Sequence, residues 1–488
     1  MLTSKKPPAH ELAEQAAAIR SKINLIELIT PTNVESEKQK WLDSGKEFFN
    51  PVFTYDDQKI VETIEETRKL VDLVKQASWE SSSEKIDRIF FDALRRRCHE
   101  IEEMAEFLRI LRGDFYFQNI GGYCLSELYG DLNYPILTLA RSMIDSSSEE
   151  AIRNMPSFVG TADKFELKKR EWFIKEYLND FNGMFSREEK ERLKNTEFDA
   201  QGIATIFKIA IDYLQENASF WGDLRKDQIV NPVYSIEIDP KWTAISVNAF
   251  SENGHPVIGI PPSRKVNGQK LIELVGHELN SHYRSAISAR TMFGLMLGDK
   301  HPLRPLIPFA THSVNHSMGE GLAKISDVRV SGADSIPKPY QVLAINFAQN
   351  KHNFKETMEY VYDLTRKNRK SEKTARDNAW NVTYRIFRGL KNTSERSGYA
   401  FTKDQVYLTG FVGTIHEYET SYYNYYEDFL SLLRLSTLTL TELREIDRTE
   451  DGLDYRIGLD PFEIWSHEKR VKNKPDVVEY IANAILNR

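Results

Sequence analysis

The chain has 488 residues and the composition of a soluble globular protein, with 41% hydrophobic and 28% charged residues. This length allows one or two domains with a sizeable core. No segment reaches the ~18 consecutive apolar residues of a membrane span. The formal net charge of −7 argues against general affinity for nucleic acid or anionic lipid. We therefore expect neither a nucleic-acid partner nor a membrane partner.

The N-terminal residues and the cysteine content favour the cytoplasm. The sequence MLTSKKPPAHELAEQ has two lysines but lacks the apolar core of a secretory signal. Only two cysteines are present, Cys98 and Cys124, and a reducing compartment suits such a chain. We expect a cytoplasmic location.

The early part of the chain, residues 10–150, has the apolar spacing of amphipathic helices, with intervals of three and four residues. The polar stretch 142–150 and the weakly patterned stretch 157–166 then form the best candidate boundary. We predict a helical N-terminal region over residues 1–160 and a second region over residues 161–488.

Three short strands are predicted in the middle of the chain. VYSIEI (233–238) and TAISVNAF (243–250) are β-branched and alternating, which predicts a hairpin or a small sheet. HPVIGIPP (255–262) is a third strand that two prolines close. Asn267 and the glycine after it are then expected to start a helix over about 269–293.

Helical patterns return after Pro308 and continue to the leucine-rich stretch 428–443 and the final stretch 478–486. Strands are therefore a minor component. The predicted fold class is mainly α with a small β-sheet (α+β).

The segment GHELNSH (276–282) is the best candidate for a chemical site. It places His277 and His282 five residues apart, with Glu278 directly after the first histidine. In a regular helix, residues five apart diverge by about 140°, so the two rings can share a metal only if the helix widens locally into a π-type turn. Neutral imidazoles suit zinc, and the adjacent carboxylate can serve as general base for a zinc-activated water.

A catalytic zinc needs a third protein ligand, and the helical pattern 318–327 offers Glu320. Glu320 lies between two glycines, which would let this helix lie close to the metal helix. The alternative for Glu320 is a helix-start carboxylate that faces the helix dipole. His312 and His316, just upstream, are rival ligands.

Four further segments occur in an order that resembles the HExxxH zinc metallopeptidase family. That family includes microtubule-associated tyrosine carboxypeptidase and bacterial relatives named for a Gln-Glu-Gly-Leu-Ala motif. The resemblance covers about residues 45–415, and beyond the metal helix it rests on FFNPVFTY (48–55), SELYG (126–130), YRIFRG (384–389) and FTKDQVYLTGF (401–411).

The resemblance implies a zincin-like metallocarboxypeptidase with one zinc ion per chain. It implies that His277, His282 and Glu320 bind the zinc and that Glu278 is the catalytic glutamate. Family members remove a C-terminal aromatic residue, so the implied substrate is a protein or peptide with a flexible C-terminal tail, acidic tubulin-like tails included. The chain departs from the bacterial pattern at Gly319, where that pattern has glutamine.

A carboxypeptidase must bind the terminal carboxylate of its substrate, and arginine does so best as a bidentate fork. Arg385 and Arg388 are the main candidates, and Arg284 is a third. Lys403 and Tyr407 could line the substrate pocket or stabilise the oxyanion. The alternatives for these residues are structural ion pairs and core positions.

Two other functions fit the same motif. An aminopeptidase or dipeptidyl-peptidase would use the same zinc chemistry and would need an acidic pocket for the substrate amine. A catalytically silent regulatory protein would retain the fold without the activity. In the peptidase hypothesis, the strand 255–260 is expected to be the sheet edge along which an extended peptide lies.

Overall fold

The computed structural model describes most of the chain and confirms the predicted fold class. Helices predominate and the sheets are small. Within this part of the chain, no helix is both long enough and apolar enough to cross a membrane. The described residues are 25–44, 47–78, 85–111, 124–155, 164–175, 185–216, 234–242, 244–248, 256–287, 317–367, 371–420 and 477–487.

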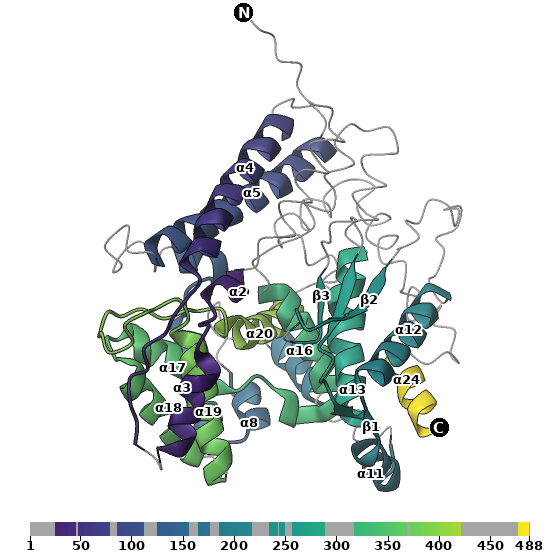
Figure 1. Cartoon of the computed structure of the whole chain (residues 1–488). Coiled ribbons are helices and arrows are strands. Elements are labelled where there is room, and N and C mark those ends of the chain that lie inside the picture. The colour runs from purple at the N-terminus through teal and green to yellow at the C-terminus, as the bar shows by residue number, and fades with distance from the viewer. Residues whose placement is uncertain are drawn as a thin grey trace, which may run out of the picture.

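The first hydrophobic core joins the N-terminal helices of the described chain to helices between residues 339 and 386. The long helices α4 and α5 lie side by side and project from the rest of the described structure (Figure 1). The elements that contribute to this core are α2 (Leu25–Ile29), α3 (Val34–Asp43), α4 (Asp57–Ser78), α5 (Lys85–Leu111), α17 (Pro339–Gln349), α18 (Phe354–Lys367) and α19 (Glu372–Ile386).

The extended segment before α4 links the N-terminal helices of this core to the residues that follow α19. Val52 forms an isolated β-bridge with Asn392, and the Tyr55 hydroxyl accepts a hydrogen bond from the Gly389 amide at 2.9 Å. Residues on both sides of the predicted boundary at 160 thus share one core. The boundary itself lies outside the described residues, so the division into two regions stays a prediction.

The three predicted strands form one mixed sheet in the order β2-β4-β3. Strand β2 (Ser235–Ile238) is parallel to β4 (Val257–Ile260), and β3 (Ser246–Asn248) is antiparallel to it. The expectation that residues 255–260 form a sheet edge is therefore wrong. Both sides of β4 are paired, because the connection from β2 to β3 leaves room for β4 between them.

The second core covers this sheet. Ile258 and Ile260 of β4 are fully buried in it, and Tyr213 stacks on Tyr480 with ring centroids 4.0 Å apart. Its other elements are α11 (Arg187–Asn195), β1 (Glu197–Phe198), α12 (Ala200–Glu216), β5 (Val266–Asn267), α13 (Gly268–Leu274) and α24 (Val477–Leu486). The helix predicted near 478–486 is thus confirmed, whereas 428–443 lies outside the described residues.

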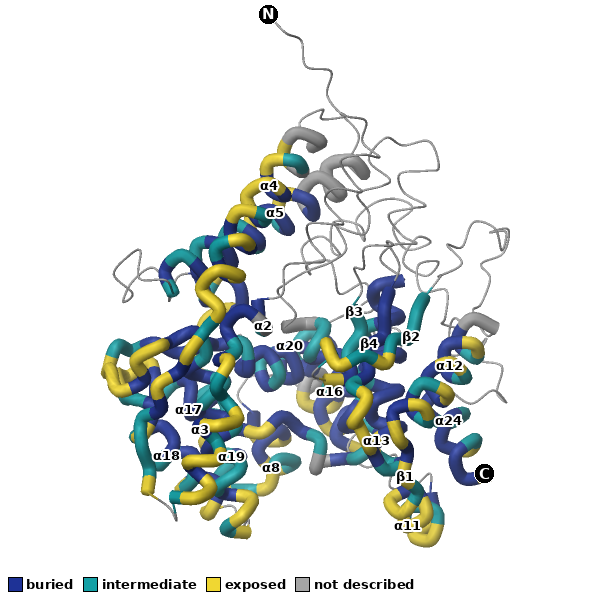
Figure 2. Tube along the Cα trace, viewed as in Figure 1, coloured by how far each residue is buried: buried dark blue, intermediate teal, exposed yellow. Residues whose placement is uncertain are grey.

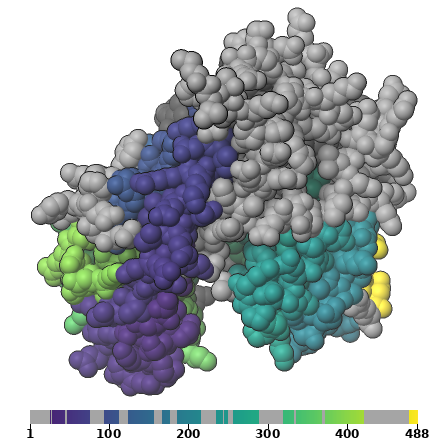
Figure 3. Space-filling model, turned by 45° about the horizontal axis from the view of Figure 1, so that its top comes forward, coloured from purple at the N-terminus to yellow at the C-terminus, as the bar shows by residue number. Residues whose placement is uncertain are grey.

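Buried and exposed faces alternate along the outer helices, and the elements around the sheet are buried more evenly (Figure 2). In the space-filling view, the N-terminal helices and the strand region lie on different sides of the molecule (Figure 3). The candidate site belongs to the strand region, because the helix that carries the two histidines follows β5 directly.

The third core packs around α16 (Ser317–Ser331) and α20 (Gln405–Thr420). These two helices cross in close contact, with α7 (Tyr134–Asp145), α8 (Ser148–Arg153) and α9 (Lys164–Phe173) around them. A Cβ atom at Gly321 would lie 2.2 Å from the Gly410 carbonyl oxygen. Gly321 therefore makes room for α20 and not for the metal helix, so the role predicted for this glycine is wrong. The expectation that α16 lies close to the metal helix is confirmed.

We predict that Gly321→Ala lowers the free energy of unfolding by about 1–3 kcal/mol, because the added methyl group must push α16 and α20 apart. The matched control is Gly413→Ala in α20, where a Cβ atom meets nothing within 4 Å. That change should raise the free energy of unfolding by up to ~1 kcal/mol through helix propensity. Urea unfolding of both variants measures the difference, and equal midpoints would contradict the close contact at Gly321.

Candidate metal centre

The helix that carries the two histidines widens where their spacing requires it. The α-helix α13 continues into the π-helix η2 (Val275–Tyr283), and residues 284–287 return to α-helical geometry. The Asn267 side chain caps the start of α13 by accepting from the Lys270 amide at 2.8 Å. Both the predicted start of this helix and its predicted widening are confirmed.

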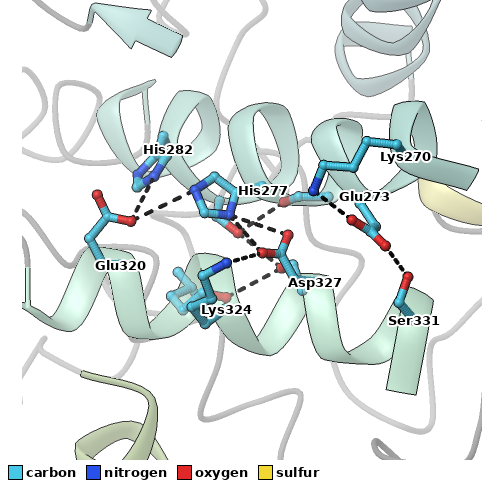
Figure 4. Close-up of polar contacts among 12 residues, drawn as sticks. Lys270, Glu273, His277, His282, Glu320, Lys324, Asp327 and Ser331 are labelled. Carbon is cyan, nitrogen blue, oxygen red and sulfur yellow. Dashed lines mark hydrogen bonds and ion pairs between the residues drawn. The ribbon is translucent and has the colours of Figure 1, made fainter. Parts of the chain in front are cut away.

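The widened turn places both imidazoles on one side of the helix, where they face Glu320 of α16 (Figure 4). The centroids of the His277 and His282 rings are 5.1 Å apart. The Glu320 Oε2 atom lies 3.7 Å from His277 Nε2 and 3.8 Å from His282 Nε2. One donor atom from each residue falls within a common span of 4.8 Å.

These three donors fit a small divalent cation. Bonds of about 2.1 Å in a tetrahedral site separate the ligand atoms by roughly 3.4 Å, and the measured separations from Glu320 need only a slight contraction. Two imidazole nitrogens with one carboxylate oxygen are a donor set that zinc favours, and a fourth position stays open. Such a set can hold zinc.

Asp327 lies beside His277, although it was not among the residues predicted from the sequence. Its carboxylate oxygens lie 3.2 and 3.1 Å from His277 Nδ1, and Lys324 donates to Oδ2 at 2.6 Å. A hydrogen bond from Nδ1–H leaves Nε2 free as a ligand atom. The signal was present in the sequence, because Asp327 follows Glu320 by two helical turns and shares its face.

The charges at the site shift the pKa values of both histidines. Burial alone would lower the pKa of His277, but the charge and hydrogen bond of Asp327, helped by Glu278 and Glu320, outweigh it and raise the value. Burial lowers the pKa of His282 to about 4, against the charge of Glu320. The His282 ring is therefore neutral at pH 7, as a metal ligand must be.

Glu278 lies in a position suited to a general base. Its side chain is buried, and Oε2 accepts a hydrogen bond from the Val247 amide of β3 at 3.1 Å. Burial and the charge of Glu320 raise its pKa to about 7, whereas His277 and the Val247 amide act in the opposite direction. A carboxylate with a pKa near neutrality both accepts and returns protons efficiently.

Two of the predicted substrate-binding residues lie close to Glu320. The Tyr407 ring centroid is 5.7 Å from the Lys324 ammonium, and the charge of Glu320, followed by burial, raises the Tyr407 pKa. Burial lowers the pKa of Lys403, and the charge of Glu320 opposes that shift. The ammonium of Lys403 forms no hydrogen bond or ion pair with another described residue.

The arginines predicted to bind a carboxylate already have partners within the chain. Arg385 donates to Asp404 at 2.5 Å. Arg388 donates to the Tyr384 hydroxyl at 2.8 Å and lies over the Tyr384 ring at 5.0 Å. Arg284 donates to Asn280 at 2.6 Å inside the metal helix. The rival ligands His312 and His316 lie outside the described residues.

The family-like segments gather in space, although they are far apart in sequence. Gln405, the first residue of α20, donates to the Tyr129 carbonyl at 3.1 Å, and the Tyr129 ring contacts Phe401 with centroids 5.5 Å apart. Tyr55 contacts Gly389, as described above. The contacts of Gln405 and Phe401 with Tyr129 hold the start of α20, the helix that carries Tyr407 towards Glu320.

One comparison with known proteins gives a match. The family model described as microtubule-associated tyrosine carboxypeptidase matches residues 337–451, which confirms the predicted resemblance over that segment. The matched segment contains Arg385, Lys403 and Tyr407, but it begins after the histidine helix and Glu320. The comparisons with curated proteins and with solved structures found no match.

Proposed function

We propose that this chain, which resembles the tyrosine carboxypeptidase family over residues 337–451, is a zinc-dependent carboxypeptidase. The observation that carries the proposal is the convergence of two imidazoles and one carboxylate within 4.8 Å, with a buried glutamate beside them. His277, His282 and Glu320 would hold one zinc ion. Bound there, zinc would acidify a water molecule and polarise the scissile carbonyl.

Proton transfer and the positioning of the reacting groups would be carried out by side chains and one backbone amide of the chain. Glu278 accepts the proton of the attacking water and delivers it to the leaving amine. The Val247 amide, 3.1 Å from Glu278 Oε2, holds that carboxylate in place. Asp327 keeps the proton of His277 on Nδ1, so that Nε2 stays directed at the metal position.

The substrate would enter along β3. Among the described strands, β3 pairs with β4 on one side, and we propose that an extended peptide binds along its other side. The Val247 amide points from that edge towards Glu278. A peptide beside β3 would therefore lie next to the proposed general base, which the paired strand β4 does not allow.

Lys403 is the best-placed group for the terminal carboxylate of the substrate. It is a cation near Glu320 and has no polar partner among the described residues, whereas Arg385 and Arg388 are engaged by Asp404 and Tyr384. We assign the carboxylate contact to Lys403 and give Tyr407 the role of a hydrogen-bond donor to the oxyanion. Arg385 would fix the position of Asp404, the residue that follows Lys403, through their hydrogen bond.

The preference for an aromatic residue rests on the resemblance alone. We propose a cytoplasmic protein or peptide with a flexible tail as the substrate, and acidic tubulin-like tails belong to that class. Gly319 lacks the side chain that the bacterial relatives place before the glutamate, so the pocket of this chain would differ there. An aminopeptidase is disfavoured, because Lys403 lies near Glu320, and a lysine there suits a terminal carboxylate better than a terminal amine.

Two isosteric changes separate metal binding from proton transfer. Glu320→Gln removes an anionic ligand, and we expect a loss of zinc affinity on the order of 10- to 100-fold together with activity. Glu278→Gln should keep about one zinc per chain but lose at least ~10²-fold in kcat, because only the proton acceptor is removed. Metal analysis and peptide hydrolysis measure both effects.

The pair also tests the alternatives. Equal zinc retention in Glu320→Gln and the unchanged protein would move the third ligand elsewhere, with His312 and His316 next in line. Hydrolysis that survives Glu278→Gln would remove that residue from the chemistry. A zinc-loaded protein that cleaves no peptide at either end would favour the regulatory protein over the enzyme.

Amidation of the substrate tests the carboxypeptidase assignment. A peptide with a free C-terminal aromatic residue should be cleaved, and its amide should not, because amidation removes the charge that Lys403 binds. We expect Lys403→Met to lower kcat/KM for the free acid on the order of 10- to 100-fold. Mass spectrometry of the products gives both rates.

Arg388→Gln is the comparison variant, since Tyr384 already engages this guanidinium. A larger loss in Arg388→Gln than in Lys403→Met would return the carboxylate contact to the arginine. Equal cleavage of free-acid and amidated peptides would leave zinc hydrolysis in place but exclude a carboxypeptidase. Sensitivity to N-terminal acetylation instead would identify an aminopeptidase.

A further inference from the structure

The π-helical geometry of the metal helix is confined to one segment. Regular α-helix precedes Val275 and follows Tyr283. A π-turn is rare because it is less favourable than continuous α-helix, so contacts specific to the widened geometry must stabilise it. Those contacts should come from the segment itself and from the elements packed against it, of which α16 makes the most extensive contact and α12, α24 and β3 make smaller ones.

Ser281 makes a contact that a regular helix does not permit. Its hydroxyl donates to the Gly276 carbonyl, five residues earlier, at 3.0 Å. Serine hydroxyls in α-helices bond to the carbonyl four residues earlier, which here would be that of His277. The bond to Gly276 is therefore specific to the π-turn, and it is shielded from water because Ser281 is 1% exposed.

Ser326 of α16 holds Ser281 from the other side. The two hydroxyl oxygens are 2.9 Å apart, and Ser326 also lies 3.4 Å from the Leu322 carbonyl. A hydroxyl donates one hydrogen. Because the Ser281 hydroxyl donates to the Gly276 carbonyl, Ser326 is the donor between the two serines. The alternative, in which Ser281 donates to Ser326 and Ser326 donates to the Leu322 carbonyl, would use the longer distance of 3.4 Å.

The position of Ser326 links the π-turn to the rest of the site. It lies directly before Asp327, and the same helix supplies Glu320. A single element thus carries the third donor atom, the partner of His277 Nδ1 and the hydroxyl that reaches the π-turn. Movement of α16 would change all three contacts together.

We propose that the Ser281–Ser326 hydroxyl pair is a positioning device that keeps the metal helix in its π register and so keeps His277 and His282 on one side of it. Neither serine would touch the metal or the substrate. Without the pair, residues 275–283 relax towards α-helix, in which the two imidazoles diverge by about 140°. The inference rests on the proposed metal site.

Zinc affinity of the full chain, measured by competition with a chromophoric chelator, tests the proposal. We expect Ser281→Ala to weaken affinity on the order of 10- to 100-fold, as for other groups that orient ligands. Ser281→Thr, which retains the hydroxyl, should restore most of it. The double change Ser281→Ala with Ser326→Ala should cost little more than Ser281→Ala alone, because both serines act through one contact.

Ser331→Ala is the matched control. Ser331 also joins α16 to the metal helix, through Glu273 and Gln269 (Figure 4), but it does so outside the π-turn. Its loss should leave zinc affinity unchanged. Equal effects of Ser331→Ala and Ser281→Ala would overturn the proposal in favour of general helix packing, and unchanged affinity in Ser281→Ala would overturn it outright.

Hydrogen exchange of the metal-free protein separates this inference from the proposed function. Ser281→Ala should accelerate exchange in peptides that span residues 275–283, and Ser331→Ala should not. That result in a chain that binds no zinc would leave the positioning role in place and remove the enzyme assignment. Unchanged exchange in both Ser281→Ala and Ser326→Ala would remove the positioning role, whatever the metal content.

Discussion

The five-residue spacing of His277 and His282 is the constraint on which the site depends. Two rings at this spacing diverge on a regular helix, so the sequence can form a shared site only with a widened turn, and the structure has one over residues 275–283. A widened turn is unfavourable alone. The burial of Leu279 and Tyr283, two residues of this turn, in the second core and the contact of the turn with α16 supply the compensating interactions.

The helix α16 packs against both the π-helix and α20, and so links the two histidines to the third core. One face directs Glu320 and Asp327 at the metal helix, and Gly321 brings another face against α20. The residues of α20 that lie nearest the site belong to the segment that matches the family model. The matched segment and the histidine helix are separate in sequence, but α16 contacts both, so one rigid element sets the distance between the proposed metal and the proposed carboxylate contact.

Local patterns predicted the helices, the strands and the π-turn that brings His277 and His282 together, because each depends on spacing within a few residues. The choice of Glu320 depended instead on the need for a third ligand and on the family resemblance. Contacts between distant segments were not predictable in this way. The central place of β4 depends on how β2 and β3 are connected, and the engagement of Arg388 depends on Tyr384 and on the packing around the start of α20. Asp327 could have been predicted, since its spacing of two helical turns from Glu320 is visible in the sequence.

The charges around the histidines support a cation at this place. Glu278, Glu320 and Asp327 are three carboxylates around two imidazoles, and Lys324 compensates only Asp327 directly. The remaining repulsion between Glu278 and Glu320 contributes to the raised pKa of Glu278. A divalent ion between His277, His282 and Glu320 would offset that repulsion, because a bound cation is the largest charge in such a site. Glu278 would then ionise at lower pH, and it would reach the base form that the proposed hydrolysis needs.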